Sequence, residues 1–207
     1  MKPTERLYHL LRLYDDSDVS MQQFHAVWCE GISVEDAVLL LNADPNTAMP
    51  DRFGGWGPGS DGSGDEVGGL LAGTMDAWVV LIGDYRCSED DTLTALSGNN
   101  RRTLGISWDL HGDNTLKYAR NGELITVLDI LDTGYRSGRD PDALDPYLHN
   151  LRFNTDEQKP GEPAVDPRES FTSALTAIGR MVGREIDKEW LDSTHNSYTV
   201  RADESDW

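Results

Sequence analysis

The sequence predicts an α+β fold in which an antiparallel sheet of four or five strands carries helices packed mainly on one face. The apolar segment AWVVLI, residues 77–82, is typical of a strand that is covered on both faces. Residues 103–131 hold three short segments that alternate between apolar and polar side chains, and the pair Asn121–Gly122 favours a tight type I′ turn between the last two. These features predict a three-stranded antiparallel meander beside the apolar strand.

The first part of the chain predicts a helix, a strand and a second helix. Within residues 3–14, apolar side chains recur at i, i+3, i+4 and i+7, as on one face of a helix. Residues 22–30 alternate with a period of two, which is typical of a strand. Ser33 and Asp36 match a capping box, so we expect a helix that begins there and stops at 42–45.

The middle of the chain changes in composition. Glycine, aspartate, serine and proline dominate residues 46–73, so we expect a flexible loop, with its most glycine-rich part at 53–69. After the apolar strand, Ser88 with Asp91 predicts the start of a short helix, and Gly98 is placed to close it.

The last third predicts two helices and a tail. Asp140, followed by proline, favours the start of one helix, and Asp166, also followed by proline, favours the start of a longer one. A further turn is expected around Trp190. We therefore expect a single α+β domain over residues 1–192 and a frayed acidic tail over 193–207.

Length and composition indicate a cytoplasmic protein. A chain of 207 residues with 38% hydrophobic side chains can bury a sizeable core. The first residues lack the pattern of a signal peptide, and the longest apolar run, 77–82, is too short to cross a bilayer. Cys29 and Cys87 are too few for a disulfide framework, although a single bridge between them stays possible.

The charge balance favours some partners over others. The chain has 18 basic and 37 acidic side chains, which gives a net charge of -19. Such a charge repels nucleic acid phosphates and anionic lipid, and it favours a protein partner with a basic surface. A solvated acidic surface with no binding role is the alternative explanation.

Four segments follow one another in an order that is recognisable: WCEGISVEDAVLLLNADP at 28–45, AWVVLIGDYRC at 77–87, the run from TLTALSGNN to TVLDIL at 92–131, and ALTAIGRMVGREIDKEWLD at 174–192. In these segments the chain resembles an actinobacterial family of proteins of unknown function, domain of unknown function 6461. The resemblance spans most of residues 24–192 and implies a fold order and a bacterial or phage origin, but no activity and no site residues. The N-terminal helix, the loop at 53–69 and the tail after Asp192 depart from it.

No sequence motif predicts a metal, a cofactor or covalent catalysis. Residues 61–65 imitate the start of a calcium loop, but Glu66 stands where the turn glycine belongs. Ser107 lacks the second glycine of a nucleophile elbow. His25 and Cys29 have a spacing that would permit a thiolate and its base, yet a small buried cysteine is the favoured interpretation. We therefore expect no metal site and no cofactor.

These observations favour a non-enzymatic acidic protein that binds another protein. An inhibitor or immunity protein of this kind covers a basic functional surface on its partner. Loops held by a rigid sheet are where binding residues concentrate, and a tryptophan among glycines can act as an anchor. A homodimer through the edge of the sheet is a further possibility. The candidate partner-binding residues are Trp56, Asp84, Tyr85, Arg86, His111, Asp113 and Asn114.

The alternative is a sensor or enzyme for a small molecule. In this hypothesis the glycine-rich loop at 53–69 acts as a lid over a groove, and Arg101, Arg102 and Tyr118 supply convergent polar groups. An enclosed pocket at these residues would favour it over a protein partner.

Overall fold

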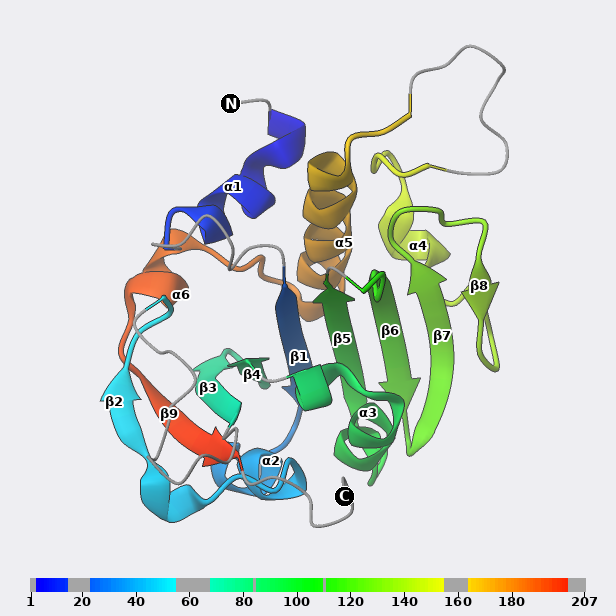
Figure 1. The fold of residues 1–207 in the computed structure, drawn as a ribbon. Coiled ribbons are helices and arrows are strands. Elements are labelled where there is room, and N and C mark those ends of the chain that lie inside the picture. Colours follow the sequence, from blue (N-terminus) through cyan, green and yellow to red (C-terminus); the bar gives the residue numbers. More distant parts are fainter. Residues whose placement is uncertain are drawn as a thin grey trace.

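The structure, a computed structural model, describes residues 3–14, 23–54, 68–83, 85–109, 111–154 and 164–200 (Figure 1). A single antiparallel sheet runs through them, with nine strands in the order β2-β9-β3-β4-β1-β5-β6-β7-β8. The strands are β1 (Phe24–Glu30), β2 (Met49–Asp51), β3 (Gly68–Met75), β4 (Trp78–Gly83), β5 (Arg102–Trp108), β6 (Thr115–Arg120), β7 (Glu123–Asp129), β8 (Arg136–Ser137) and β9 (His195–Val200). The helices are α1 (Arg6–Arg12), α2 (Val34–Leu40), α3 (Asp90–Ser97), α4 (Asp145–Leu148), α5 (Pro167–Val182) and α6 (Lys188–Asp192), and the 3₁₀ turns are η1 (Pro3–Glu5), η3 (Pro45–Thr47) and η4 (Tyr85–Ser88).

The α+β class is confirmed, but the sheet is about twice as large as predicted. Three of its additional strands, β2, β3 and β9, come from segments that the composition predicts to be a loop and a tail. Gly68–Met75 forms β3, which pairs with β4 on one side and with His195–Val200 in β9 on the other. The expectation of a loop up to residue 73 and of a frayed end after Asp192 is therefore wrong for these two segments. The central part of the glycine-rich loop, 55–67, lies outside the described residues.

The predicted meander is confirmed in β5, β6 and β7. Each strand pairs antiparallel with the next, and a bulge interrupts the β6–β7 ladder after Tyr118. Asn121 and Gly122 have φ angles of 54° and 78°, as the two central residues of a type I′ turn require.

The alternation in residues 104–110 predicts a strand with one buried face, but both faces of β5 are buried. The face of β5 that carries Gly105 lies under α3. A Cβ atom on Gly105 would come within 2.8 Å of Leu93 Cδ2 in that helix. The absence of a side chain at this glycine therefore allows the helix to approach the strand closely.

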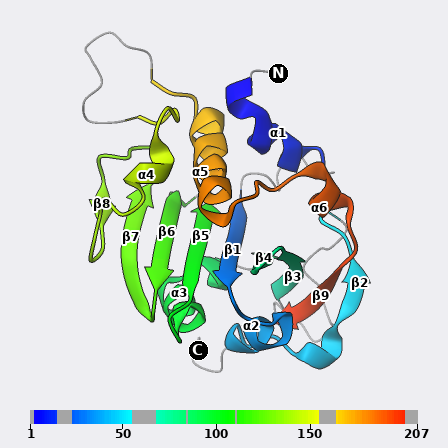
Figure 2. The same ribbon diagram turned by 180° about the vertical axis from the view of Figure 1, so that it is seen from behind.

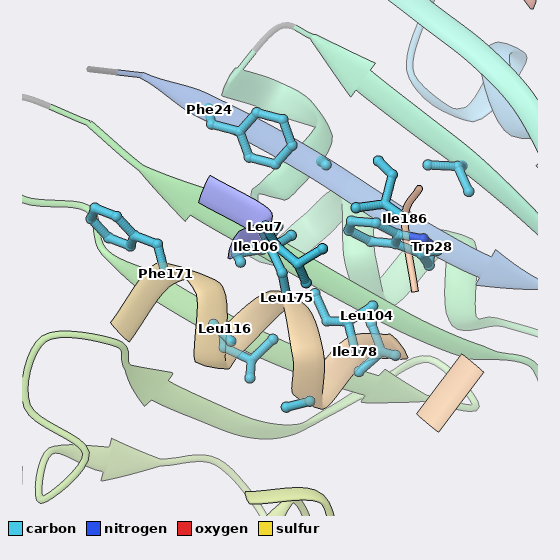
Figure 3. Packing of buried hydrophobic residues seen from close by; sticks show 14 of the residues in the cluster. Leu7, Phe24, Trp28, Leu104, Ile106, Leu116, Phe171, Leu175, Ile178 and Ile186 are labelled. Carbon is cyan, nitrogen blue, oxygen red and sulfur yellow. The ribbon is translucent and has the colours of Figure 1, made fainter. Parts of the chain in front are cut away.

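Helices cover both faces of the sheet, rather than mainly one. Figure 2 shows α1, α4 and α5 over one face, which we call the α5 face, and Figure 1 shows α3 over the other, the α3 face. On the α5 face, Trp108 stacks between Phe24 and Phe171, with ring centroids 4.5 and 4.6 Å apart. On the α3 face, α2 and α3 pack on β1 around Val27 and Cys29. Figure 3 shows the α5 side chains Phe171, Leu175 and Ile178 among the sheet residues Leu104, Ile106 and Leu116.

Two of the predicted helix starts are confirmed. The side chain of Ser33 accepts a hydrogen bond from the backbone N–H of Asp36 at the start of α2, and Asp166 caps α5 through the N–H of Arg168. Pro167 then occupies the first helical position.

The other two helix starts are wrong. Ser88 belongs to η4 instead, because its hydroxyl donates to the carbonyl oxygen of Tyr85. Asp140 lies in a turn, where its backbone N–H donates a hydrogen bond to the carbonyl oxygen of Ile125. The helix α4 begins only at Asp145. Among the described helices, none combines the length and the apolar character needed to cross a bilayer.

Candidate functional site

Three of the predicted partner-binding residues meet at one hollow on the α3 face. Tyr85 comes from η4, whereas His111 and Asp113 come from the turn between β5 and β6. The hollow has a volume of about 410 Å³, and we call it the acidic hollow because three carboxylates line it against a single lysine. Its lining residues are Gln23, His25, Tyr85, Ser88, Glu89, Asp109, His111, Asp113 and Lys117.

Two of the other predicted residues, Arg86 and Asn114, do not line this hollow. Arg86 does not line the hollow, and its guanidinium carbon lies 5.9 Å from the centroid of the Tyr85 ring. Asn114 uses its carbonyl oxygen to accept the N–H of Ile130, which joins the β5–β6 turn to the end of β7. Trp56 and Asp84 lie outside the described residues.

Asp109 shapes the rim of the acidic hollow. Its carboxylate accepts the backbone N–H groups of His111, at 2.7 Å, and Asp113, at 3.0 Å. Burial acts to raise the pKa of Asp109, but the backbone amides of Asp113, His111 and Gly112 outweigh it and hold this pKa below its usual range. The turn therefore presents a carboxylate that stays ionised at neutral pH.

The floor of the acidic hollow is fixed by buried hydrogen bonds. His25 Nδ1 lies 3.0 Å from Ser88 Oγ, and the Ser88 hydroxyl donates to the carbonyl oxygen of Tyr85 at 3.0 Å. A hydroxyl has one proton, so when Ser88 donates to Tyr85 its oxygen can only accept a hydrogen bond from His25 Nδ1. Lys117 Nζ donates to the carbonyl oxygen of Ser88 and forms an ion pair with Asp90, which is not a lining residue.

A second and larger hollow lies on the α5 face, beside the start of β5 and the end of β6. It has a volume of about 740 Å³, and we call it the basic hollow because three arginines line it against a single carboxylate, Asp140. Its lining residues are Arg102, Tyr118, Arg120, Ile125, Arg139, Asp140, Ala143, Pro146, Tyr147 and Met181.

The basic hollow contains two of the three residues expected for a small-molecule pocket. Arg102 and Tyr118 both line it, whereas Arg101 donates from Nε to the carbonyl oxygen of Leu96 at the end of α3. None of its lining residues within the described ranges comes from the glycine-rich segment that was expected to form a lid.

The two cysteines do not form a reactive site. Cys29 is buried, its thiol donates to the carbonyl oxygen of Leu96 at 3.3 Å, and Thr103 Oγ1 donates to the sulfur at 3.4 Å. Burial raises the pKa of the Cys29 thiol, so the thiolate is disfavoured. No disulfide joins Cys29 to Cys87. In the part of the chain that the structure describes, no group of three or more His, Cys, Asp or Glu side chains is placed to hold a metal ion.

Sequence reasoning missed Arg120, Arg139 and Tyr147 in the basic hollow, and Glu89 and Lys117 in the acidic one. A signal was present for Arg120, because the predicted turn at 121–122 ends its strand there, and an antiparallel meander brings that end of the strand beside the start of β5. The others reach their positions through the packing of loops and helices, for which no short motif exists.

The chain belongs to the family described as "Family of unknown function (DUF6461)", which it matches over residues 58–205. The match omits the segment 28–45, and it extends into the tail after Asp192, contrary to the expectation that this tail departs from the family. It therefore includes both β3 and β9. Comparison with curated proteins and with solved structures finds no match to this chain.

Proposed function

We propose that this member of the family is a non-enzymatic binding protein of the inhibitor or immunity type, which covers a basic surface on a protein partner. In this proposal a lysine or arginine side chain of the partner enters the acidic hollow. The observation that carries it is the juxtaposition of an exposed aromatic ring with three carboxylates at one concave place, in a chain of net charge -19.

Tyr85 is suited to act as the anchor. It is 54% exposed although it is a large aromatic residue, and it stands at the rim of the hollow. Aromatic side chains contribute a large share of interface energy, and their rings attract cations. Below it, Asp109 and Asp113 supply negative charge, while Lys117 is already paired with Asp90. A cationic group that entered the hollow would therefore meet unbalanced carboxylates beside an aromatic face.

The edges of the sheet do not favour the alternative of a homodimer through strand pairing. β2 has three residues, one of which is Pro50, and β8 has two. Short edge strands that carry proline or charge are poor templates for pairing with another chain. The proposal therefore places the partner at the acidic hollow and not at a strand edge.

The test is affinity capture of the partner from the native host with matched variants of the full chain. Tyr85→Ala and Asp113→Asn remove the anchor and one carboxylate, and Glu35→Gln, at an exposed residue of α2, is the control that removes the same charge elsewhere. We expect wild type and the control to retain one basic protein, and Tyr85→Ala to bind it about 30-fold or more weakly.

Salt dependence gives a second and independent measurement. Screening lengths fall to about 10 Å at 0.1 M salt, so the association rate with the captured partner should fall as salt rises. An association rate that does not depend on salt, retention of the partner by both variants, or tight binding to duplex DNA at physiological salt would contradict the proposal.

A further inference from the structure

Two arginines face each other in the β5–β6 ladder. Arg102 and Arg120 are directly opposite in the antiparallel register, and both line the basic hollow. Like charges at directly opposite positions destabilise a sheet. Glu30 pairs directly with one of them, because its carboxylate accepts hydrogen bonds from Nε and Nη2 of Arg102 at 2.6 Å each, and it attracts Arg120 only at longer range. In the described part of the chain, the guanidinium of Arg120 has no hydrogen-bond or ion-pair partner.

Tyr118 adds an unused hydrogen-bond donor. It lies two residues before Arg120 on the same face of β6, and it is only 7% exposed. Its phenol lines the basic hollow, and no residue in the described ranges forms a hydrogen bond with it. The ring is buried, whereas the hydroxyl itself keeps contact with the open space of the hollow, where it can donate to a ligand. Burial raises the pKa of Tyr118, while Arg120 and Arg102 act in the opposite direction, which shows that both guanidinium groups are close to a phenol that is protonated at neutral pH.

The rest of the basic hollow supplies a further charge and apolar surface. Arg139 contributes a third guanidinium and is held by Glu123, the residue that pairs with Arg120 in the β6–β7 ladder. Ile125, Met181 and the ring of Tyr147 add apolar and aromatic lining, and Asp140 adds the one carboxylate. The volume of about 740 Å³ lies within the range of small-molecule sites.

We propose that the basic hollow is a binding site for a small organic anion, in which a carboxylate or phosphate group is joined to an apolar or aromatic body. The anionic group accepts hydrogen bonds from the guanidinium of Arg120 and the phenol of Tyr118. Arg102, held in place by Glu30, adds positive charge at its free Nη1. The body of the ligand packs against Met181 and Tyr147.

The charge arrangement supports an anion over a neutral or cationic ligand. Such an anion pairs Arg120 and relieves the repulsion across the ladder, because it places negative charge beside both guanidinium groups. A neutral ligand leaves this repulsion in place, and a cation adds to it. The site is separate from the acidic hollow, which lies on the other face of the sheet, so it does not depend on the proposed protein partner.

The test is to titrate the full chain with benzoate, phenyl phosphate and the neutral benzyl alcohol, and to follow backbone amide shifts by NMR. We expect saturable shifts at residues 102, 118, 120 and 125 with at least one anion and none with benzyl alcohol. The anion that binds with the higher affinity identifies the preferred headgroup as carboxylate or phosphate. Saturable shifts with neither anion, shifts spread evenly over surface arginines, or equal shifts with benzyl alcohol overturn the proposal.

Matched variants separate binding from stability. Arg120→Gln should weaken the anion by about 10- to 100-fold, as expected for loss of a hydrogen bond to a charged group. Arg168→Gln, an exposed arginine in the first turn of α5, is the control and should bind like wild type. Without ligand, Arg120→Gln should melt no lower than wild type, because it removes a like-charge pair. Equal affinity for Arg120→Gln and wild type, or a lower melting temperature of the ligand-free variant, overturns the proposal.

Tyr118→Phe tests the donor at the same site. The ring remains and the unpartnered hydroxyl is removed, so we expect the fold to persist while the anion binds several-fold more weakly. An unchanged affinity in this variant would show that the Tyr118 hydroxyl does not contact the anion, and it would overturn this part of the proposal. Tyr85→Ala, at the acidic hollow, should leave anion binding unchanged, so failure of one proposal is distinguishable from failure of the other.

Discussion

Replacement of Glu30 by glutamine should destabilise the protein by about 1–2 kcal/mol. Glu30 makes two charge-assisted hydrogen bonds of 2.6 Å to Arg102, whose guanidinium carbon lies 5.2 Å from the centroid of the Trp78 ring. The two side chains are 34% and 32% exposed, so solvent screening reduces their contribution from that of a buried pair. The loss of the carboxylate also leaves Arg102 and Arg120 facing each other without compensation.

The assay is thermal and chemical denaturation of Glu30→Gln, Arg120→Gln and the double variant. For a chain of this length, the expected loss lowers the melting temperature by about 2–8 °C. The second substitution should recover part of this loss, because it removes the charge that repels Arg102. Equal losses in the single Glu30→Gln and the double variant would refute the reasoning, because they would show that Arg120 does not interact with this pair.

The same pair predicts a dependence on pH. The hydrogen bond from Arg102 lowers the pKa of Glu30 below its usual value. A carboxyl whose folded pKa is lowered stabilises the protein above its unfolded pKa, and this stabilisation is lost as the pH falls through the folded pKa. The stability difference between wild type and Glu30→Gln should therefore be full at neutral pH and shrink in acid. A difference that grows in acid would contradict this assignment.

Three further substitutions test the packing. Cys29→Ala should lose about 1–2 kcal/mol in urea denaturation while partner binding persists, and a thiol reagent should label native Cys29 slowly; rapid labelling at neutral pH would contradict its role as a core residue. Ser33→Ala should lose about 1 kcal/mol, measured in the same way, because it removes the cap of α2; unchanged stability would show that the cap is dispensable. Gly105→Ala should destabilise the protein by about 1–3 kcal/mol, because its Cβ would meet Leu93; a more stable variant would show that α3 moves away freely.

Local signals predicted the centre of the sheet well. The meander follows from alternation and from the Asn121–Gly122 turn, both of which act over neighbouring residues. The caps at Ser33 and Asp166 are local in the same sense. Ser88 has the same sequence signal as these caps but does not cap a helix. Its hydroxyl instead forms a hydrogen bond with His25, 63 positions away, in the floor of the acidic hollow. A tertiary contact of this kind cannot be predicted from the neighbouring residues.

The outer part of the sheet was missed because glycine there serves packing and not flexibility. A Cβ atom on Gly73 would lie 2.2 Å from His195 Nδ1, so the glycine in β3 allows this ring to lie against the strand. The ring of His195 stacks on Trp190 with centroids 4.1 Å apart, and Trp190 Nε1 donates to the carbonyl oxygen of Thr74. The contacts of Gly73 with His195 and of Trp190 with Thr74 join residues more than 100 positions apart, which composition in a short window does not reveal.

The two hollows likewise contain residues that local signals predicted and residues that only tertiary packing brings together. Tyr85, His111 and Asp113 were found because they lie in loops beside predicted strands, and the structure brings them to one hollow. The basic hollow needed the register of β5 and β6, which places Arg102 opposite Arg120. Its wall, which includes Met181 at the end of α5, depends on the docking of a helix whose position the sequence does not specify.

The position of β9 has a consequence for how the chain folds. β9 lies between β2 and β3, and its pairs with β2 join Met49 to Ser197 across 148 positions of sequence. Contacts of such long sequence separation form slowly, because a large loop must close before they stabilise anything. Until residues 195–200 dock, β3 offers an eight-residue open edge with Leu70, Leu71 and Ala72 along it. We therefore expect the meander to form before this side of the sheet, and the intermediate to be vulnerable to aggregation through β3.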